Sequence, residues 1–282
     1  MTAKSWNSPV TGITPPPPER FTRKVHPPME RTPLAGQTAL VTGSTRGLGR
    51  TIAEWLAAAG ADIVVSGRAD DAVAESVAAV EALGRRAWGI PADLARPEEA
   101  HRLAEATLAT VDRLDILVNN AGMSIQRDFW DVSDAEWDEQ VTTNWRAPFV
   151  LAQHAARHMM ARGIRGRIVN VSTIGARACH TDRLVYDRAK GDVEVMTRNM
   201  AYELGPHGIS VNCVAPGNIA HRPGAAPADW WPAAEKKIPY GRLGRGEDIA
   251  AAVRFFCLPE SAFTTGQTLL VDGAHDSYLP ER

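Results

Sequence analysis

The sequence is short of cysteine and has no excess of charge. Its 282 residues include three cysteines, Cys179, Cys213 and Cys257, an odd number without the spacing of a disulfide framework or a metal site. We therefore expect reduced thiols and a cytoplasmic protein. The 31 basic and 33 acidic side chains leave a net charge of -2, so no global field favours nucleic acid or an anionic membrane. A small-molecule substrate is the expectation that remains.

Long hydrophobic runs are also missing. No segment reaches the roughly 20 apolar residues that a membrane-spanning helix needs, and the N-terminal region has no apolar run of signal-peptide length. We expect a protein that is neither exported nor anchored. The composition, 44% hydrophobic and 23% charged, is typical of one folded domain large enough for a full core.

Residues 1–35 differ from the rest of the chain because they are rich in proline, including the run from Pro15 to Pro18. Proline cannot continue a helix or donate to a sheet, so we expect an extended arm with polyproline character. Two interpretations stay open. The arm is a disordered tail, or it packs on a neighbouring subunit through Trp6, Phe21 and Val25.

From residue 36 to 282 short apolar runs alternate with longer amphipathic segments, which predicts one domain. The predicted strands are Thr38–Val41, Asp62–Ser66, Ala87–Ile90, Asp115–Asn119, Arg167–Val171, Ile209–Val214 and Thr268–Val271. The predicted helices are Leu48–Ala59, Asp71–Leu83, Pro97–Val111, a long one from about Ser133 to Arg162, one around Tyr186, and Glu247–Leu258. Parallel neighbours need crossover connections, so this pattern predicts an α/β fold, a doubly wound seven-stranded parallel sheet of the Rossmann type with helices on both faces.

A glycine-rich segment joins the first predicted strand to the first predicted helix. Gly43, Gly47 and Gly49 have the spacing G-x-x-x-G-x-G, and glycines there let backbone amides and the helix N-terminus approach a pyrophosphate. We therefore predict a dinucleotide site with contacts from Gly43, Thr45, Arg46, Gly47, Leu48 and Gly49. The alternative is a plain tight turn.

The end of the second predicted strand carries Ser66-Gly67-Arg68 where an acid commonly accepts the adenosine 2′-hydroxyl. Arg68 and Arg46 could instead grip a 2′-phosphate, a role for which guanidinium is well suited. We expect NADP(H) to be preferred, with NAD(H) still usable. Exchanging Gly67-Arg68 for Asp-Ala should then shift the preference towards NAD.

Tyr186 and Lys190 are four residues apart, so they share one face of a predicted helix. A neighbouring ammonium favours the phenolate, which would make the tyrosine a usable general acid or base. Taken alone, the pair is also typical of a solvated face or a core tyrosine.

Together these motifs resemble the short-chain dehydrogenase/reductase family in its compact single-domain branch, over about residues 36 to 275. Asp93-Leu94, Asn120-Ala121-Gly122, Asn144 with Pro148, and Pro216-Gly217 follow in the family's order. The resemblance implies that Asp93 and Leu94 contact the adenine, that Asn120, Ala121 and Gly122 line the cofactor cleft, and that Pro216, Gly217 and Ile219 contact the nicotinamide end. It also implies a homodimer or homotetramer.

The resemblance further implies that Tyr186 exchanges a proton with a substrate oxygen, and that Asn144 links Lys190 to solvent through water. It implies that Lys190 lowers the tyrosine pKa and holds the nicotinamide ribose, so that Tyr186 and Lys190 also count among the cofactor contacts. The family usually has serine where this chain has Thr173, and Ser172 lies one residue earlier. Because successive strand residues point to opposite faces, only one of these hydroxyls is expected to polarise the carbonyl. We favour Thr173.

The segment from about residue 218 to 240 is, by resemblance, the lid over the substrate. Arg177, His180, Arg183, His221 and Arg222 lie in or near the expected substrate segments. They favour a polar substrate, such as a sugar, a sugar acid or another hydroxy compound, unless they are surface charges. His154 and His158 share a helix face, but no third ligand is present and we predict no metal site.

The leading hypothesis is therefore an NADP(H)-dependent oxidoreductase that interconverts a secondary alcohol and a ketone. Two alternatives stay open. One is an epimerase or dehydratase that retains its cofactor, although this class usually has another glycine spacing and a larger C-terminal region. The other is a non-catalytic, cofactor-sensing regulator, which the presence of Asn144, Tyr186 and Lys190 disfavours.

Overall fold

The computed structural model describes residues 32–220 and 230–277. The proline-rich arm predicted for residues 1–35 lies outside the described residues except for its last four. His221 and Arg222 also lie outside them. None of the described helices combines the length and the apolar character that a bilayer crossing requires.

One parallel sheet forms the centre of the described part of the chain, as predicted. Its order is β3-β2-β1-β4-β5-β6-β7. The strands are β1 (Thr38–Val41), β2 (Asp62–Gly67), β3 (Ala87–Pro91), β4 (Ile116–Asn119), β5 (Arg167–Val171), β6 (Ser210–Pro216) and β7 (Thr268–Val271). Three strands have the predicted bounds, and the other four differ from them by one or two residues at one or both ends, because the ends of elements depend on tertiary contacts that a pattern does not record.

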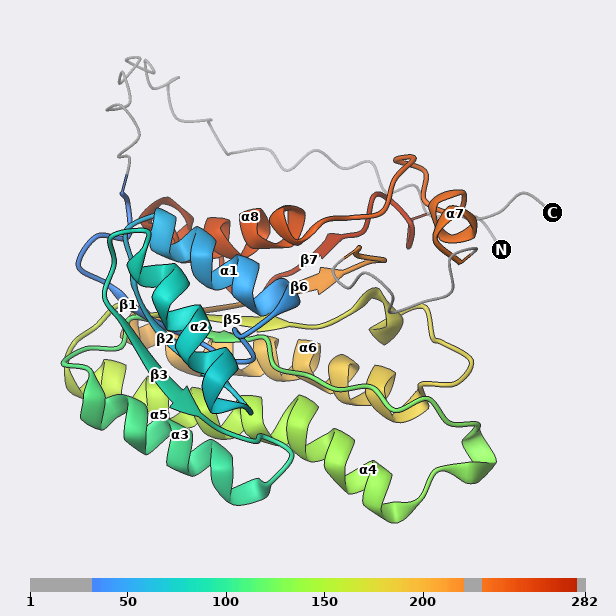
Figure 1. Cartoon of the computed structure of the whole chain (residues 1–282), viewed down its shortest axis with the longest axis horizontal. Helices are drawn as coiled ribbons and strands as arrows, with labels where there is room; N and C mark the ends of the chain where they lie inside the picture. Colours follow the sequence, from blue (N-terminus) through green and yellow to red (C-terminus); the bar gives the residue numbers. More distant parts are fainter. Residues whose placement is uncertain (1–31, 221–229, 278–282) are drawn as a thin grey trace, which may run out of the picture. The chain divides into compact units, whose positions relative to one another are not determined.

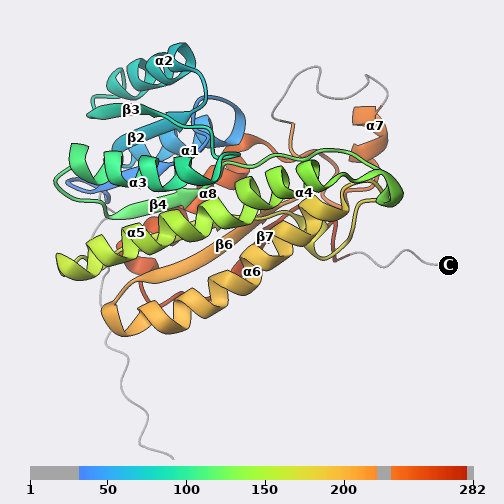
Figure 2. The same cartoon turned by 90° about the horizontal axis from the view of Figure 1, so that it is seen from below.

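Helices cover both faces of the sheet (Figures 1 and 2). The helices α1 (Gly47–Ala58), α2 (Asp70–Glu81) and α8 (Gly246–Cys257) lie on one face, and α3 (Pro97–Thr110), α5 (Ala147–Ala161) and α6 (Leu184–Leu204) on the other. Alternate strand residues enter the two cores: Ala39 and Val41 of β1 face α1 and α8, whereas Leu40 faces the opposite core. Burial on both faces explains why the strands read as continuous apolar runs.

The strand order reverses between β1 and β4, and the loops that follow these two strands are tied together. The Thr42 hydroxyl accepts hydrogen bonds from the backbone N–H groups of Asn120 and Ala121, both at 3.0 Å. The Asn120 side-chain amide donates to the Thr42 carbonyl oxygen at 2.9 Å. In open α/β sheets ligands bind at the carboxyl ends of the strands at such a reversal, so the fold itself marks this edge as the site.

The long helix predicted for residues 133 to 162 is interrupted. It consists of α4 (Asp134–Val141), a π-helical stretch (Thr142–Arg146) and α5. Pro148 has no N–H group and cannot donate to the carbonyl of Asn144, four residues earlier, so the regular α-helical ladder fails there. The π-helical stretch accommodates this loss, and such stretches occur mostly at functional sites.

The region expected to be a lid without a pattern of its own contains a short helix, α7 (Trp230–Glu235). Ala234 of this helix forms a small apolar cluster with Ile238 and Leu243. The backbone N–H of Tyr240 donates to the carbonyl of Gly273 at 3.1 Å. These contacts attach the end of this region to the loop that follows β7.

Candidate active site

Helix α6 brings Tyr186 and Lys190 to the carboxyl end of β5. The Lys190 side chain is 3% exposed, and its Nζ donates to the carbonyl oxygen of Val171, the last residue of β5, at 2.8 Å. The same Nζ lies 6.0 Å from the centroid of the Tyr186 ring. The two residues therefore share one face of the helix, as their spacing predicts.

Thr173 and Ser172 point to different places, as expected for neighbouring residues at a strand end. The Thr173 side chain lies near the Tyr186 phenol and acts to lower its pKa, and its hydroxyl accepts the backbone N–H of Gly175 at 3.2 Å. The Ser172 hydroxyl lies 3.1 Å from both the Lys190 carbonyl oxygen and Glu194 Oε1, in the interior. Only the threonine contacts the phenol that the sequence singles out.

The pKa of Tyr186 moves opposite to the direction expected from the lysine alone. Burial of the ring raises the pKa of Tyr186 to about 12, and the adjacent Asp187 carboxylate acts in the same direction. Burial also lowers the pKa of Lys190 to about 8. Because the ammonium points at Val171 and desolvation dominates, the phenol is held neutral over the physiological range.

Asn144 sits in the π-helical stretch and is fully buried. Its side-chain amide donates to the carbonyls of Met123 and Gln140, at 2.8 and 2.9 Å, and its Oδ1 accepts the Met123 N–H at 3.1 Å. A Cβ built on Gly122 would lie 2.9 Å from Asn144 Oδ1 and 3.2 Å from Lys190 Nζ. The asparagine, the lysine and the loop after β4 thus meet at one point.

The glycine loop after β1 is tightly closed. Gly43 and Gly47 have φ of +63° and +54°, and a Cβ at Gly49 would lie 2.2 Å from the Gly43 carbonyl oxygen. Arg46 is the N-cap residue of α1, and no side chain caps the helix there. The free backbone N–H groups of this first turn suit an anionic group such as a pyrophosphate, so these residues fit a dinucleotide.

Arg46 and Arg68 flank a single contact between the glycine loop and the end of β2. A Cβ on Gly67 would lie 2.4 Å from Thr45 Cγ2, so Thr45 rests on Gly67 and the two arginines follow these residues in the chain. Both arginines are exposed, and no ion pair in residues 32–220 or 230–277 involves either. Two available cations therefore lie next to the predicted adenosine ribose position.

The remaining predicted cofactor contacts lie at the same edge of the sheet. Asp93 and Leu94 follow β3, and the Asp93 carboxylate accepts the Ala95 N–H at 3.4 Å. Gly217 follows β6, and a Cβ there would lie 2.7 Å from Asp272 Cα. Ile219 pairs with Gly244 in an isolated bridge. The structure thus collects the predicted residues along one edge, although their contacts with a cofactor stay a prediction.

Arg177, His180 and Arg183, the described residues among those predicted near the substrate, each lie close to a carboxylate. Arg177 lies 3.3 Å from Glu194, and His180 Nδ1 lies 2.8 Å from Asp187 Oδ1. The backbone N–H of His180 donates to the other Asp187 oxygen at 2.7 Å. Sequence reasoning missed both acids, although Asp187 directly follows Tyr186 and Glu194 lies four residues beyond Lys190.

The two histidines at helical spacing have other partners. His158 Nε2 accepts the Leu114 N–H at 3.2 Å, and His154 Nε2 lies 3.1 Å from His101 Nδ1. In the described part of the chain, no group of three or more His, Cys, Asp or Glu side chains is placed to hold a metal ion.

A doubly wound sheet with a glycine loop after β1 and a Tyr-Lys pair beside β5 defines an oxidoreductase of the Rossmann class. The chain belongs to the short-chain dehydrogenase/reductase family. A family model described as enoyl-(acyl carrier protein) reductase matches residues 43–274. The family comprises NAD(P)-dependent enzymes that act on hydroxyl and carbonyl groups, so this protein is an alcohol/ketone oxidoreductase.

Individual relatives resemble most of the chain. The short-chain reductase protein NovJ of Streptomyces niveus is 37% identical over 243 residues, 83% of this chain and 92% of the relative. Gluconate 5-dehydrogenase of Gluconobacter oxydans (strain 621H) is 34% identical over 243 residues, 85% of this chain and 94% of that enzyme. The crystal structure of the angucycline C-6 ketoreductase LanV with bound NADP has a TM-score of 0.80 and 32% identity, and the match covers 87% of this chain and 97% of that one.

Proposed function

We propose that this protein is an NADP(H)-dependent oxidoreductase that interconverts a secondary alcohol and a ketone on a polar hydroxy compound, with Tyr186 as the general acid and base. The observation that carries the proposal is the placement of Tyr186 beside Lys190 at the carboxyl end of β5, where the Thr173 side chain also lies near the phenol. This arrangement would put an acid/base candidate and a hydroxyl donor next to the same substrate oxygen. Family membership supports the reaction class.

The cofactor assignment is supported by the closed glycine loop and by the two arginines beside it. The first turn of α1 would hold the pyrophosphate, and Arg46 and Arg68 would hold the adenosine 2′-phosphate. The relative LanV binds NADP. A bound nicotinamide supplies the hydride, or accepts it in the opposite direction.

The residues of the chain handle the proton. In reduction, Tyr186 donates its proton to the carbonyl oxygen while Thr173 donates a hydrogen bond to that oxygen. The raised pKa of Tyr186, caused by burial, keeps the phenol protonated and suits this direction. After this transfer Tyr186 must regain a proton from solvent, and we propose that Lys190 and Asn144 relay it. Burial lowers the pKa of Lys190 to about 8, which suits a lysine that passes protons.

The contacts of Arg177 and His180 with carboxylates weaken the case for an anionic substrate. Arg177 forms an ion pair with Glu194, and His180 hydrogen-bonds with Asp187, so these two do not call for an anionic substrate. The proposed substrates, sugars, sugar acids and other hydroxy compounds, all carry hydroxyl groups that the site could recognise by hydrogen bonds. The similarity to gluconate 5-dehydrogenase supports a polyhydroxy compound.

We also propose a homo-oligomer, as the family resemblance implies. Large side chains are exposed along α4 and its continuation: Trp137 is 44%, Trp145 40% and Phe149 45% exposed. Exposed apolar groups that gather on one element are typical of an interface. Light scattering of the purified protein measures the assembly directly, and a monomer at micromolar concentration would contradict the proposal.

The central experiment mixes the protein with NADPH and a panel of ketones derived from sugars and other hydroxy compounds, and with NADP and the corresponding alcohols. Tyr186→Phe should abolish the change in nicotinamide absorbance and leave NADPH binding, measured by fluorescence, nearly intact. Tyr202→Phe is the matched control, because Tyr202 is on the same helix and 87% exposed. Turnover retained by Tyr186→Phe would rule out the proposed role.

A further inference from the structure

Arg167 is a buried cation that the proposed reaction does not use. It is the first residue of β5 and is 8% exposed. Its Nη1 donates to the carbonyl oxygens of Arg165 and Gly166, both at 2.9 Å, but its Nε has no hydrogen-bond partner among the described residues. Burial lowers the pKa of Arg167, yet guanidinium stays charged in proteins. A buried charge without a counter-ion is costly, so this group lacks an anion.

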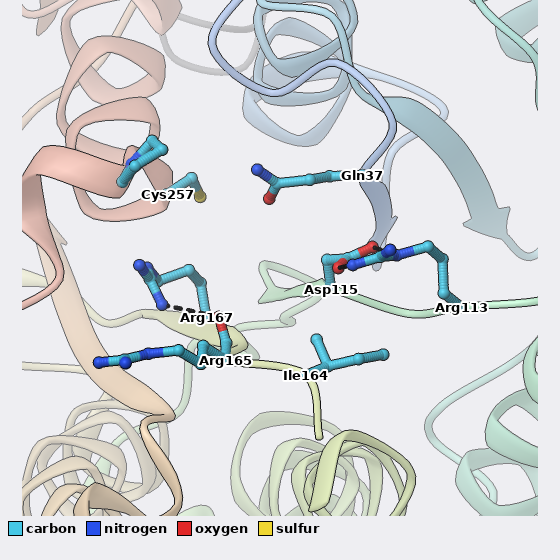
Figure 3. Close-up of a pocket in the computed structure, with 8 residues that line it drawn as sticks. Gln37, Arg113, Asp115, Ile164, Arg165, Arg167 and Cys257 are labelled. Atoms are coloured by element: carbon cyan, nitrogen blue, oxygen red, sulfur yellow. Dashed lines mark hydrogen bonds and ion pairs between the residues drawn. The ribbon is translucent and has the colours of Figure 1, made fainter. Parts of the chain in front are cut away.

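A cavity of about 190 Å³ opens beside Arg167 at the amino-terminal edge of the sheet, the edge opposite to Tyr186. It is lined by the segments before β1, β4 and β5 and by the end of α8. Its lining residues are Gln37, Arg113, Asp115, Ile164, Arg165, Arg167, Cys257 and Pro259 (Figure 3). This volume is well above what one water molecule needs, so it has room for a small ion with part of its hydration shell.

The charges on the cavity wall do not cancel. Asp115 is its only carboxylate, and it is already engaged: Arg113 Nε donates to Oδ2 at 2.9 Å, and the Thr38 N–H donates to the same oxygen at 2.9 Å. Arg165 has no ion-pair partner in the described part of the chain. Figure 3 shows Arg165 and Arg167 on one side of the cavity and the Arg113–Asp115 pair on the other.

We propose that this cavity binds a small oxyanion, a phosphate or carboxylate group, between Arg167 and Arg165. The planar guanidinium fork matches both groups, and the free Nε of Arg167 provides a fixed donor. The Gln37 amide can add a further hydrogen bond. Helix α8 ends at Cys257 on the same wall, and the partial negative charge of a helix C-terminus opposes an anion, so we expect weak binding. The site is independent of the proposed reaction.

Thermal unfolding tests the proposal. The protein is saturated with NADPH, so that the glycine loop is occupied, and is then heated in sodium phosphate, in sodium malonate and in sodium chloride of equal ionic strength. A ligand at ten times its Kd should raise Tm by about 3–6 °C beyond the chloride control. The comparison of phosphate with malonate shows which oxyanion the cavity prefers.

Variants locate the effect. Arg165→Glu places a carboxylate at the cavity and should abolish the shift without endangering the fold, since Arg165 is exposed. Arg167→Met should abolish it too. Arg162→Glu, the same charge change at an exposed residue outside the lining, should retain it.

The outcomes separate cleanly. A shift lost in Arg167→Met but kept in Arg165→Glu would contradict the proposed placement of the anion between the two arginines. The proposal is overturned if phosphate and malonate act no better than chloride, if both cavity variants keep the full shift, or if Arg162→Glu loses as much of it as Arg165→Glu.

Discussion

The two ends of β5 each hold a buried cation, and the two cations differ in kind. At the carboxyl end Lys190 donates to the carbonyl of Val171, the last residue of the strand. At the amino end Arg167, the first residue, donates to two backbone carbonyls just before it. They are 3% and 8% exposed, respectively. A lysine and an arginine thus lie at opposite ends of the same strand and are buried to a similar extent.

The difference lies in how each cation can respond to burial. Lysine can lose its proton, and burial lowers the pKa of Lys190 to about 8, close enough to neutral pH for a proton relay. Arginine cannot do so in a protein, so Arg167 can be compensated only by an added anion. A buried lysine is therefore suited to proton transfer, and a buried arginine to anion binding.

The largest expected effect is on kcat, which should depend on the cation at the carboxyl end of β5 and not on the one at the amino end. Lys190→Met should lower kcat by about 10²–10⁴-fold, since it removes the proposed relay from beside Tyr186. Arg167→Met should keep kcat within about threefold, because distant sites act independently. Steady-state kinetics of both variants at saturating cofactor provide the measurement. Equal losses would break the comparison.

A second test compares the two hydroxyls that follow β5. Thr173→Ala should reduce kcat by about 10²–10³-fold, the usual cost of removing one donor to a reacting oxygen. Ser172→Ala should instead cost about 1–2 kcal/mol of stability, because its hydroxyl contacts the Lys190 carbonyl and Glu194 inside the core. Kinetics and urea unfolding of both variants, with Thr173→Ser as the rescue control, distinguish the roles. The reverse pattern would mean that Ser172 is the catalytic hydroxyl.

The titration of Lys190 should also appear in the stability of the cofactor-free protein. Between its folded pKa of about 8 and the ordinary lysine pKa of 10.5, the unfolded chain binds more protons at this residue than the folded one, so its contribution to stability rises with pH. Below pH 8 both states are protonated and the cost of burying the charge is fully present. Relative to Lys190→Met, the wild type should gain on the order of 1–3 kcal/mol between pH 8 and 10. A flat difference in urea unfolding would contradict the shift.

The smallest effect concerns cofactor choice. Arg68→Ala should raise KM for NADP by about tenfold, because one charge-assisted hydrogen bond to phosphate is lost, and should leave KM for NAD unchanged. The structure argues against testing this by replacing Gly67, since a Cβ there would meet Thr45 and disturb the loop itself. Arg46→Ala is the companion variant, and Arg50→Ala, an arginine of α1 paired with Glu54 and Glu75, is the control. Equal changes for both cofactors would argue against a 2′-phosphate contact.

The amount that the sequence reveals differs between the two ends of β5. The strands, the glycine loop and the Tyr-Lys pair follow from local rules of periodicity and spacing, so the carboxyl edge could be predicted. The π-helical stretch was missed, although Pro148 four residues after Asn144 contains the signal. The Thr173–Tyr186 contact needs coordinates, because spacing alone cannot choose between neighbouring hydroxyls.

The amino-edge cavity could not be predicted. Gln37, Asp115, Arg167 and Cys257 are far apart in sequence, and only the strand order brings them together. The lack of a partner for Arg167 Nε depends on which carboxylates are already engaged, and a sequence does not show this. The direction of the Tyr186 pKa shift could not be predicted either, since it depends on how far the fold shields the phenol from water.

Gly122 gives the site an unusual vulnerability. Its missing side chain leaves room for Asn144 and Lys190 to come close to the loop after β4. A single methyl group there, with no charge and no hydrogen bond, would act as a wedge between them. A screen for inactive variants should therefore find substitutions of Gly122 among the harmful ones, although this position carries no reactive group.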